Sequence, residues 1–586
     1  MKLTHKKTAY IYWGFLLLFA VLAMVMNYVQ SMRGTPLIDY AYQADVAYRI
    51  FQGEIPYRDF FLVVNPGTYY LMAMLMHLTG EYNHYVQLGG TMVISALIII
   101  ISFLVMRQVS RSPRFTLLML LPLLFAGHSI YPFPNYDINT FLIVISAFLA
   151  CLHYDTDQKH PFLWGFFAGL LVGASYLFKQ NIGLIFIPVW TLCVLFICFF
   201  DKSRRWFIFL GAALTSIALI FSVFFIWLNQ ADALQDFIYQ TFTFPKQIRD
   251  PVAAIFVMKD EYISFFKYGI NELRVVFIPG ILLAVGYASL RFIPLIWKKN
   301  RKIQQMVKKI LEIALVVWLG WLSFTLYQQL SLVPDREVMV NTGIWFFMVV
   351  FSAILFIWNG VLDFRTRKVG FITLLPIICI ALIFASSLSQ GLRGSTYGMW
   401  PVYFIMMAWI IRWLTGQKID FAWRWVAVFL CVFITLFLAW KVQTQSRIIS
   451  YTDLNGTVAD SSLTGMEGLT TPGLWLPEFD QLVEYINTSI PATDTIAFLP
   501  GEDLVFEATE RQNPLFCNQV FEQTCDKDIH GILKEIEEKD VDWLILKNQY
   551  QLRYWKTNPP ITEGELPNSF VKIKDIGFYS VYKINR

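Results

Sequence analysis

The sequence predicts a mainly α-helical, multi-spanning membrane protein that ends in a small α/β domain. Three observations lead to this fold class. The 586 residues are 56% hydrophobic and only 15% charged, with a mean hydropathy of +0.51. Apolar runs long enough to cross a bilayer recur as far as residue 440, and an alternation of helix and strand patterns follows them. A water-soluble globular chain of this length rarely has such a composition.

We expect about thirteen membrane spans, because a helix needs roughly 20 mainly apolar residues to cross the hydrocarbon core. They are predicted near residues 8–30, 84–106, 115–131, 138–153, 162–178, 182–200, 206–230, 274–297, 310–330, 341–361, 369–388, 398–414 and 425–440. The first run is long and no small-residue cleavage site follows it, so it reads as a retained helix rather than a signal peptide.

Lysine and arginine gather in alternate connections, such as "KKNRKIQQMVKK" at 298–309 and "DFRTRK" at 363–368. The positive-inside rule assigns those loops, and the N-terminus, to the cytoplasm. The first loop, the loop 231–273 and everything after 441 then lie on the periplasmic or extracellular side of the cell inner (plasma) membrane. The net charge of +5 follows from these loops and calls for no nucleic-acid partner.

The chain divides into three predicted regions. Residues 1–440 form the transmembrane domain, 441–475 a linker or lid segment rich in polar residues, and 476–586 an exported α/β domain. The pattern of the last region predicts helices near 478–489 and 527–538, and strands near 495–499, 542–547, 569–574 and 577–583. Cys517 and Cys525 lie in this exported region, where an oxidising compartment makes them candidates for a disulfide.

The first loop, "PLIDYAYQADVAYRIFQGEIPYRDFFLVVNPGTYYL" at 36–71, is unusually charged for so apolar a chain. Its charged residues are Asp39, Asp45, Arg49, Glu54, Arg58 and Asp59. Tyr42, Val46 and Ile50 recur at helical spacing, which predicts a short amphipathic helix in the membrane interface that holds Asp39 and Asp45 against the bundle. A second apolar piece, at 65–80, is too short to span and is expected to lie at the surface or dip in.

The order D-x5-D-x3-R-x3-G-E-x-P-Y-R-D, followed by "NPGTYYL" and "LTGE", resembles the first exported loop of the GT-C superfamily of integral-membrane glycosyltransferases. The resemblance is to the members that use polyprenyl-phosphate sugars: protein O-mannosyltransferases, aminoarabinose transferases and the Rgt-type group. Three further segments are similar to that group: "NYDINTFLIVISAFLACL" at 135–152, "GASYLFKQNIGLIFIP" at 173–188 and "FLPGEDLVFEATERQNP" at 498–514.

The resemblance implies a hexosyl- or pentosyltransferase that moves a sugar, with inversion, from a polyprenyl-phosphate donor in the bilayer to a hydroxyl of a cell-envelope acceptor. That acceptor is a glycolipid, a polysaccharide or a protein, and the reaction takes place on the exported face. A sugar hydroxyl is a poor nucleophile at neutral pH, so one carboxylate can serve as general base, while the departing phosphate needs no acid.

By resemblance the base is Asp39, and Asp45, Asp59 and Asp137 are competing candidates. Asp137 could instead position the acceptor or a metal. The resemblance calls for no certain cofactor, and a divalent metal is left open, since Asp39, Asp45 and Asp137 carry the oxygen ligands that such an ion prefers.

A preorganised cation is the expected stabiliser of the departing phosphate, and Lys179 fits that role. The other candidates on the exported side are Arg58, Arg336 and Arg393. Several relatives have a lysine just before the proline of the first loop, where this chain has Asn65, which cannot neutralise a phosphate. Tyr57, with Asp59 and Asn65, completes the first-loop candidates.

Three alternatives stand beside this function: a transporter, an enzyme that uses diphosphate-linked saccharides, and a non-catalytic scaffold, which unchanged cell chemistry after deletion would favour. A transporter or flippase of a lipid-linked saccharide would carry polar groups in mid-span, in broken helices and an inverted repeat, whereas here the ionisable residues gather at predicted span ends. A polymerase or ligase that uses diphosphate-linked saccharides would need a large exported loop rich in Arg and His, and the loop 331–340 is too short.

Overall fold

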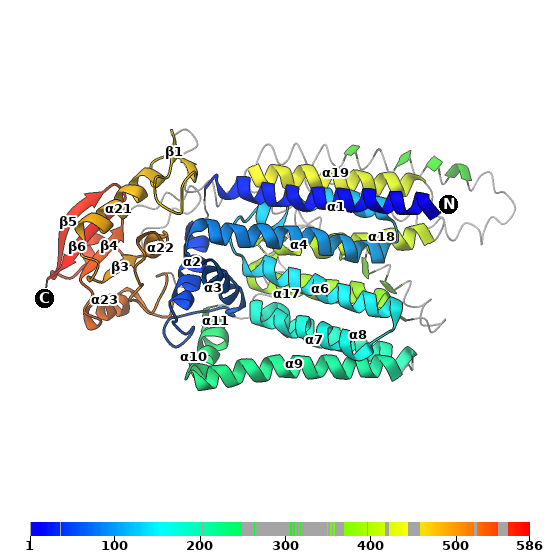
Figure 1. Ribbon diagram of the computed structural model, residues 1–586, viewed down its shortest axis with the longest axis horizontal. Coiled ribbons are helices and arrows are strands. Elements are labelled where there is room, and N and C mark those ends of the chain that lie inside the picture. The colour runs from blue at the N-terminus through cyan, green and yellow to red at the C-terminus, as the bar shows by residue number, and fades with distance from the viewer. Residues whose placement is uncertain are drawn as a thin grey trace.

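The computed structural model describes residues 2–34, 37–201, 204–248, 369–394, 396–416, 421–443, 457–520, 524–548 and 561–585, with short helical pieces between 263 and 357. Long helices run side by side in a bundle, and a domain that contains a β-sheet covers one end of it (Figure 1). The bundle helices are α1 (Lys2–Ser31), α4 (His84–Ser110), α6 (Tyr136–Asp157), α7 (Pro161–Phe178), α8 (Gln180–Asp201), α9 (Arg204–Gln230), α17 (Phe371–Gly394), α18 (Thr396–Gly416) and α19 (Phe421–Gln443).

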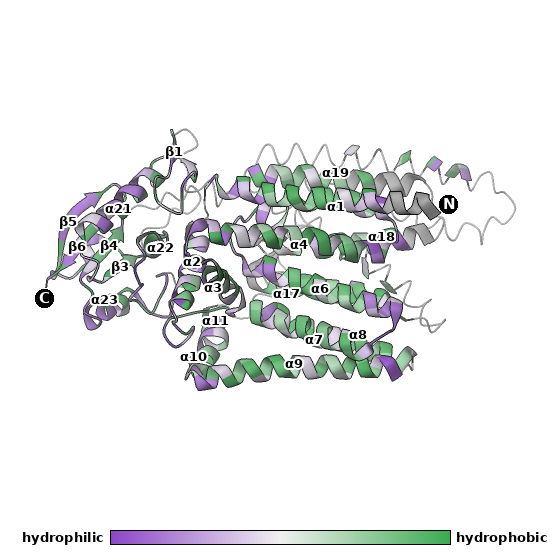
Figure 2. Ribbon diagram, in the orientation of Figure 1, coloured by the Kyte–Doolittle hydropathy of each residue, from purple (hydrophilic) through white to green (hydrophobic). Residues whose placement is uncertain are grey.

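The composition of these helices confirms a multi-pass membrane protein. Among the described residues, 7 helices are long and apolar enough to cross a bilayer, and the stretches Gly398–Arg412 and Cys431–Gln443 are shorter apolar helices. Figure 2 shows hydrophobic residues along most of the bundle and hydrophilic ones gathered on the domain at its end. Large apolar side chains such as Leu17, Phe199 and Val223 are 66%, 63% and 60% exposed, as expected of a surface that faces lipid.

One predicted span differs from the structure. The apolar run at 115–131 forms α5 (Pro113–Leu123), and a separate 3₁₀ turn η1 (Gly127–Ser129) follows it. Pro122 stands in the last turn of α5, and Gly127 has a φ of 59°, a left-handed conformation that ends the helical path. The predicted spans at 274–297, 310–330 and 341–361 fall on residues outside the described ranges, apart from the short helical pieces.

Glycines at every fourth position bring α7 and α9 together. A Cβ atom added to Gly165 would lie 2.2 Å from the carbonyl oxygen of Phe209, and one added to Gly169 would lie 2.2 Å from that of Ala213. Small residues at this spacing let two membrane helices approach to backbone contact, which maximises van der Waals packing where the hydrophobic effect supplies no driving force.

Short elements fill the space between the bundle and the domain at its end (Figure 1). They are α2 (Leu37–Phe51), α3 (Gly67–Thr79), α10 (Leu234–Ile238), a π-helical turn η2 (Tyr239–Thr243) and α11 (Phe244–Ile248). The expected helix of the first loop is therefore present as α2. Every residue of α2 from Tyr40 to Ile50 is buried, so the helix is covered on all sides rather than exposed along one face.

The C-terminal domain is built on a four-stranded mixed sheet of order β3-β4-β6-β5. The strands are β3 (Ile496–Leu499), β4 (Trp543–Lys547), β5 (Phe570–Ile576) and β6 (Tyr579–Ile584), and the helices are α21 (Trp475–Ser489), α22 (Val505–Thr509), α23 (Ile529–Glu538) and the 3₁₀ turn η4 (Glu563–Glu565). β3 pairs in parallel with β4, and the other pairs are antiparallel. The helices and strands predicted in this region are confirmed, whereas α22 was not predicted.

A buried ionic network fixes the segment that leaves β3. Lys547, at the end of β4, lies 2.6 Å from Glu502 Oε1 and 2.8 Å from Asp503 Oδ2. Asp503 also accepts hydrogen bonds from the Trp475 indole at 3.1 Å and the Tyr579 hydroxyl at 2.8 Å. Because β3 and β4 are parallel, their carboxyl ends meet at one edge, and the network there fixes the start of α22.

The segment between bundle and domain contains a hairpin of β1 (Val458–Asp460) and β2 (Thr470–Pro472). Thr470 donates from its backbone N–H and its hydroxyl to the carbonyl oxygen of Met32, at 2.9 and 3.0 Å. The hairpin is thereby fastened to the end of α1.

We expect Gly169→Val to lower the melting temperature of the purified protein, because the new side chain would meet the backbone of α9 and overpacking costs about 1–3 kcal/mol. Differential scanning fluorimetry in detergent micelles measures the change. Gly211→Ala is the control, because nothing lies within 4 Å of a Cβ at that position on α9. Equal melting temperatures for the two variants would contradict the packing argument.

Candidate functional site

Asp137 and Lys179 form a buried ion pair at the end of the bundle nearest the C-terminal domain. The Lys179 ammonium donates a hydrogen bond to Asp137 Oδ1, and the two side chains are only 4% and 6% exposed. Asp137 lies in the first turn of α6, where the Asn135 side chain caps the helix by accepting from the N–H groups of Asp137 and Ile138, at 2.9 and 3.3 Å. A pair taken out of water in this way is strongly destabilised if one partner is lost.

Lys179 stands at the junction of two helices. It follows α7 in an extended conformation, with φ −150° and ψ 111°, and α8 begins at the next residue. Its ammonium lies 5.3 Å from the centroid of the Tyr136 ring, a cation–π distance. The amino-terminal ends of α6 and α8 both lie at this pair, and the dipole of each helix contributes positive potential there.

The first loop lies directly against this junction. Asn65 donates from its side chain to the carbonyl oxygen of Tyr176, and Gln180 donates to that of Val63 at 3.0 Å. A Cβ on Gly67 would lie 2.7 Å from the Leu177 carbonyl oxygen, so the chain approaches α7 as closely as glycine allows. Asn65, noted in the sequence as a replacement for a cation, therefore serves here as a backbone anchor.

The other side of the first loop contacts the C-terminal domain through Arg49. This side chain is 2% exposed and ion-pairs with Glu54 at 2.6 Å. Its guanidinium also donates to Leu515 O and Asn518 Oδ1 of the C-terminal domain, at 2.7 and 2.8 Å, and to Asp59 O at 3.2 Å. Arg49 thus ties α2, the loop after it and the segment 515–518 into one contact region.

Asp45 of α2 and Glu507 of α22 lie near enough at the same interface for their charges to interact. Asn513 donates to Asp45 Oδ2 at 3.0 Å. Burial raises the pKa of Asp45 to about 6, against the opposing effects of Arg49 and Asn513. Burial, and then the Asp45 carboxylate, raise the pKa of Glu507 well above its usual value. The sequence led us to expect Asp45 against the bundle, whereas its hydrogen bond goes to the C-terminal domain.

The remaining predicted residues occupy different settings. Asp39 is half-buried in the first turn of α2. Arg58 and Asp59 pair with one another at 2.8 Å on the surface, and Asp59 also accepts from the backbone of Ile55 at 2.7 Å. Tyr57 is fully buried and donates to Val64 O at 3.0 Å.

Two phosphate-binding candidates have no described side chain. Arg336 lies outside the described residues, and Arg393 lies in the last turn of α17 with its side chain outside them. The structure therefore brings together Lys179 and Asp137, and separately Asp45 and Arg49.

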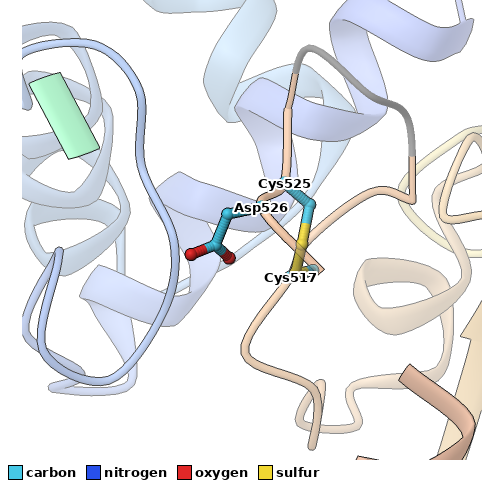
Figure 3. Close-up of side chains that lie close together, drawn as sticks. All are labelled: Cys517, Cys525 and Asp526. Carbon is cyan, nitrogen blue, oxygen red and sulfur yellow. A yellow bond between two sulfur atoms is a disulfide. The ribbon is translucent and has the colours of Figure 1, made fainter. Parts of the chain in front are cut away.

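Cys517 and Cys525 are joined in a disulfide, and Asp526 lies beside them (Figure 3). The three form a group whose ligand atoms lie within 4.8 Å of one another, in the part of the chain that the structure describes. Sulfur atoms bonded to each other are not thiolates, the form in which cysteine binds metals. This group is therefore not a metal site in the oxidised protein.

Sequence reasoning missed four residues that organise the site: Gln180, Gln240, Asn513 and Asn518. Gln240 of η2 donates to Tyr57 O at 2.8 Å and accepts from the Leu62 N–H at 2.7 Å. All four are neutral amides, which carry no charge signal in a sequence. The segment 498–514 resembled one in related soluble domains, and Asn513 lies within it, but that resemblance gave no indication of what the residue contacts.

No protein-family model and no curated protein matches the chain. Among solved structures, the oligosaccharyltransferase of Archaeoglobus fulgidus in complex with Zn and sulfate is 12% identical, with a TM-score of 0.49 over 91% of this chain and 68% of that one. ArnT from Cupriavidus metallidurans bound to undecaprenyl phosphate is 12% identical, with a TM-score of 0.44 over 97% of this chain and 98% of that one.

A third structure is archaeal AglB from Archaeoglobus fulgidus in complex with an inhibitory peptide and a dolichol-phosphate. It is 11% identical, with a TM-score of 0.47 over 92% of this chain and 70% of that one. Identities and TM-scores as low as these carry no argument about what the present chain does.

We expect Lys179→Met to lower the melting temperature strongly, because it leaves the Asp137 carboxylate buried without its partner, a loss of about 3–5 kcal/mol. The double variant Asp137→Asn, Lys179→Met should recover most of that loss. Lys534→Met is the control, because the Lys534 side chain is 74% exposed. If the single and double variants melted at the same temperature, the ion pair would have no role in stability.

The packing of α2 against α22, where Asp45 and Glu507 are buried, is expected to weaken as the pH rises. Both carboxyl groups have raised pKa values, so the docked state binds more protons than the undocked one, and stability is lost as pH rises from about 4 through the Asp45 pKa of about 6. For Asp45 a shift of this size amounts to roughly 3 kcal/mol. Arg49 opposes the effect and Glu54 adds to it.

Melting temperatures of the wild type and Glu507→Gln between pH 5 and 8 measure this dependence. The neutral amide cannot charge, so the advantage of the variant over the wild type should grow with pH. Glu537→Gln, on the exposed face of α23, should track the wild type at every pH. A constant difference between Glu507→Gln and wild type would contradict the assignment.

Proposed function

We propose that this protein is a glycosyltransferase of the membrane, which moves a sugar from a polyprenyl-phosphate donor to a hydroxyl of a cell-envelope acceptor on the exported face, with inversion. The observation that carries the proposal is the buried Asp137–Lys179 pair at one end of the bundle, against the first loop. The first-loop motif is the sequence feature that led to it.

The proposed role of Lys179 is to hold the donor phosphate. Its ammonium and the starts of α6 and α8 concentrate positive potential in a site that is largely closed to water, where each charge interaction is stronger than in solution. Asp137 orients the ammonium before the donor binds. As the glycosidic bond to phosphate breaks, the negative charge that builds on the phosphate is stabilised by this arrangement.

The proposed general base is Asp39. The first-loop motif carries this assignment, because the resemblance gives the role of base to the first acid of that motif. Asp39 is half-buried in the first turn of α2, close enough to solvent to pass a proton on. It would accept the proton of the acceptor hydroxyl as that oxygen attacks the anomeric carbon.

Membranes that contain equal amounts of wild type, Asp39→Asn, Lys179→Gln or Asp460→Asn are assayed with a panel of radiolabelled polyprenyl-phosphate sugars. We expect Asp39→Asn to lower kcat by about 10²–10⁴-fold, the usual contribution of a general base. Lys179→Gln should raise the KM for the donor. Asp460, exposed on β1, serves as the control and should leave transfer unchanged.

Undiminished transfer by Asp39→Asn would move the base to Asp45, Asp59 or Asp137. If the wild type transferred no sugar from any donor, but moved a labelled lipid-linked saccharide across the bilayer of proteoliposomes, the transporter function would replace this one.

A further inference from the structure

The Arg49 guanidinium donates four hydrogen bonds, one from Nε, two from Nη1 and one from Nη2, and is also ion-paired with Glu54. Nε donates to Glu54 Oε2 at 2.8 Å, and Nη1 donates to Leu515 O and Asn518 Oδ1 at 2.7 and 2.8 Å. Nη2 reaches Asp59 O at 3.2 Å and Glu54 Oε2 at 2.6 Å. Since all three of its nitrogens already have protein acceptors, the structure favours a positioning role for Arg49 over contact with a phosphate or a sugar.

The hydrogen-bond partners of Arg49 belong to the first loop and to the C-terminal segment 515–518, and these two parts of the chain are also hydrogen-bonded to each other. The Phe61 N–H donates to Phe516 O at 2.8 Å, and Asn518 Nδ2 donates to Phe61 O at 3.2 Å. The ring of Phe60 lies 4.6 Å from the guanidinium carbon. The first loop is therefore joined to the C-terminal segment along residues 59–61, with Arg49 at the centre.

The same loop is held on its opposite side by elements of the bundle end. Gln240 brackets it at Tyr57 and Leu62, through bonds of 2.8 and 2.7 Å. Gln180, the residue after Lys179, accepts from Asn65 N at 3.3 Å and donates to Val63 O at 3.0 Å. Between α2 and α3 the loop contains turns and one isolated β-bridge, Pro56–Phe60, and these side-chain bonds fix it against its neighbours.

We infer that Arg49 is a positioning residue that couples the C-terminal domain to the Lys179 junction: it clamps the first loop to the segment 515–518, and the loop in turn holds the α7–α8 turn that carries Lys179. Docking of the C-terminal domain thereby sets the geometry of the Asp137–Lys179 site. The effect on catalysis rests on the proposed function, whereas the mechanical coupling does not.

Hydrogen exchange followed by mass spectrometry, on the full-length protein in detergent micelles, tests the coupling without an activity assay. We expect Arg49→Gln to accelerate exchange at 57–66 by at least about tenfold, the equivalent of one or two lost charge-assisted bonds. Exchange at 176–181, around Lys179, should rise as well. Arg49→Lys should act in the same direction, because three donors cannot replace a fork of five.

Arg33→Gln is the matched control, since Arg33 is an exposed arginine at the same end of the bundle. Asn518→Ala covers the case in which Arg49→Gln does not fold: it removes one acceptor and should produce a smaller increase at 57–66. Unchanged exchange at 57–66 in a folded Arg49→Gln or Asn518→Ala protein would overturn the inference, and so would an increase confined to 57–66 with none at 176–181 in Arg49→Gln.

Transfer assays on the same variants separate this inference from the proposed function. If the wild type is active, Arg49→Gln should lower kcat. Guanidinium added at about 20 mM, far below the concentrations that unfold proteins, should partly restore both kcat and slow hydrogen exchange in Arg49→Ala. If the wild type transfers no sugar, the proposed function fails, and the exchange rates still decide whether Arg49 couples the two regions.

Discussion

A guanidinium shielded from water must place every N–H group on an acceptor, and this constraint on Arg49 shapes the end of the bundle. Arg49 lies on α2, and its acceptors come from the loop that follows and from the C-terminal domain, so none of the three can shift without leaving a charged donor unsatisfied. Leaving a buried charged group without a partner is more costly than losing an ordinary hydrogen bond. The loop between α2 and α3 depends on this contact because its own structure is limited to turns and one isolated β-bridge.

The Asp137–Lys179 pair follows the same rule on the bundle side of that loop. Asp137 lies in the first turn of α6 and Lys179 at the carboxyl end of α7, and the helix dipoles favour a negative charge at the first position and a positive charge at the second. Between the two charged centres stand neutral amides, Asn65, Gln180 and Gln240, which fix backbone atoms. Arg49 thus lies on one side of the first loop and the Asp137–Lys179 pair on the other, and the amides fix the backbone of the loop between them.

Much of the fold could be predicted from the sequence because it depends on local pattern. Long apolar runs predicted the helices α1, α4 and α6 to α9, and the alternating helix and strand patterns of the C-terminal region predicted β3 to β6. The pattern failed at 115–131, where uniform hydropathy concealed the break at Gly127. The pattern also suggested that α2 would have an exposed face. The sequence of one helix does not show that a domain from a distant part of the chain covers it.

The candidate site was predictable only in part, for a related reason. Lys179 and Asp137 were recognised individually by resemblance, but nothing in linear spacing pairs residues that are 42 positions apart. The contact of Arg49 with Leu515 spans 466 positions. Contacts between residues so far apart leave no pattern in the local sequence. The helix that carries Arg49, in contrast, has such a pattern.

That sequence separation has a consequence for biogenesis. At about 5–20 residues per second, the ribosome needs roughly 25–90 s after Arg49 to make the acceptors that this side chain requires. During that interval the first loop would be outside the bilayer, with Arg49 hydrated and the conformation of the loop not yet fixed. Synthesis of the segment 515–518 is thus the event that completes the contacts of the first loop, and a chain that stops before it would leave a correctly inserted bundle whose first loop lacks these partners.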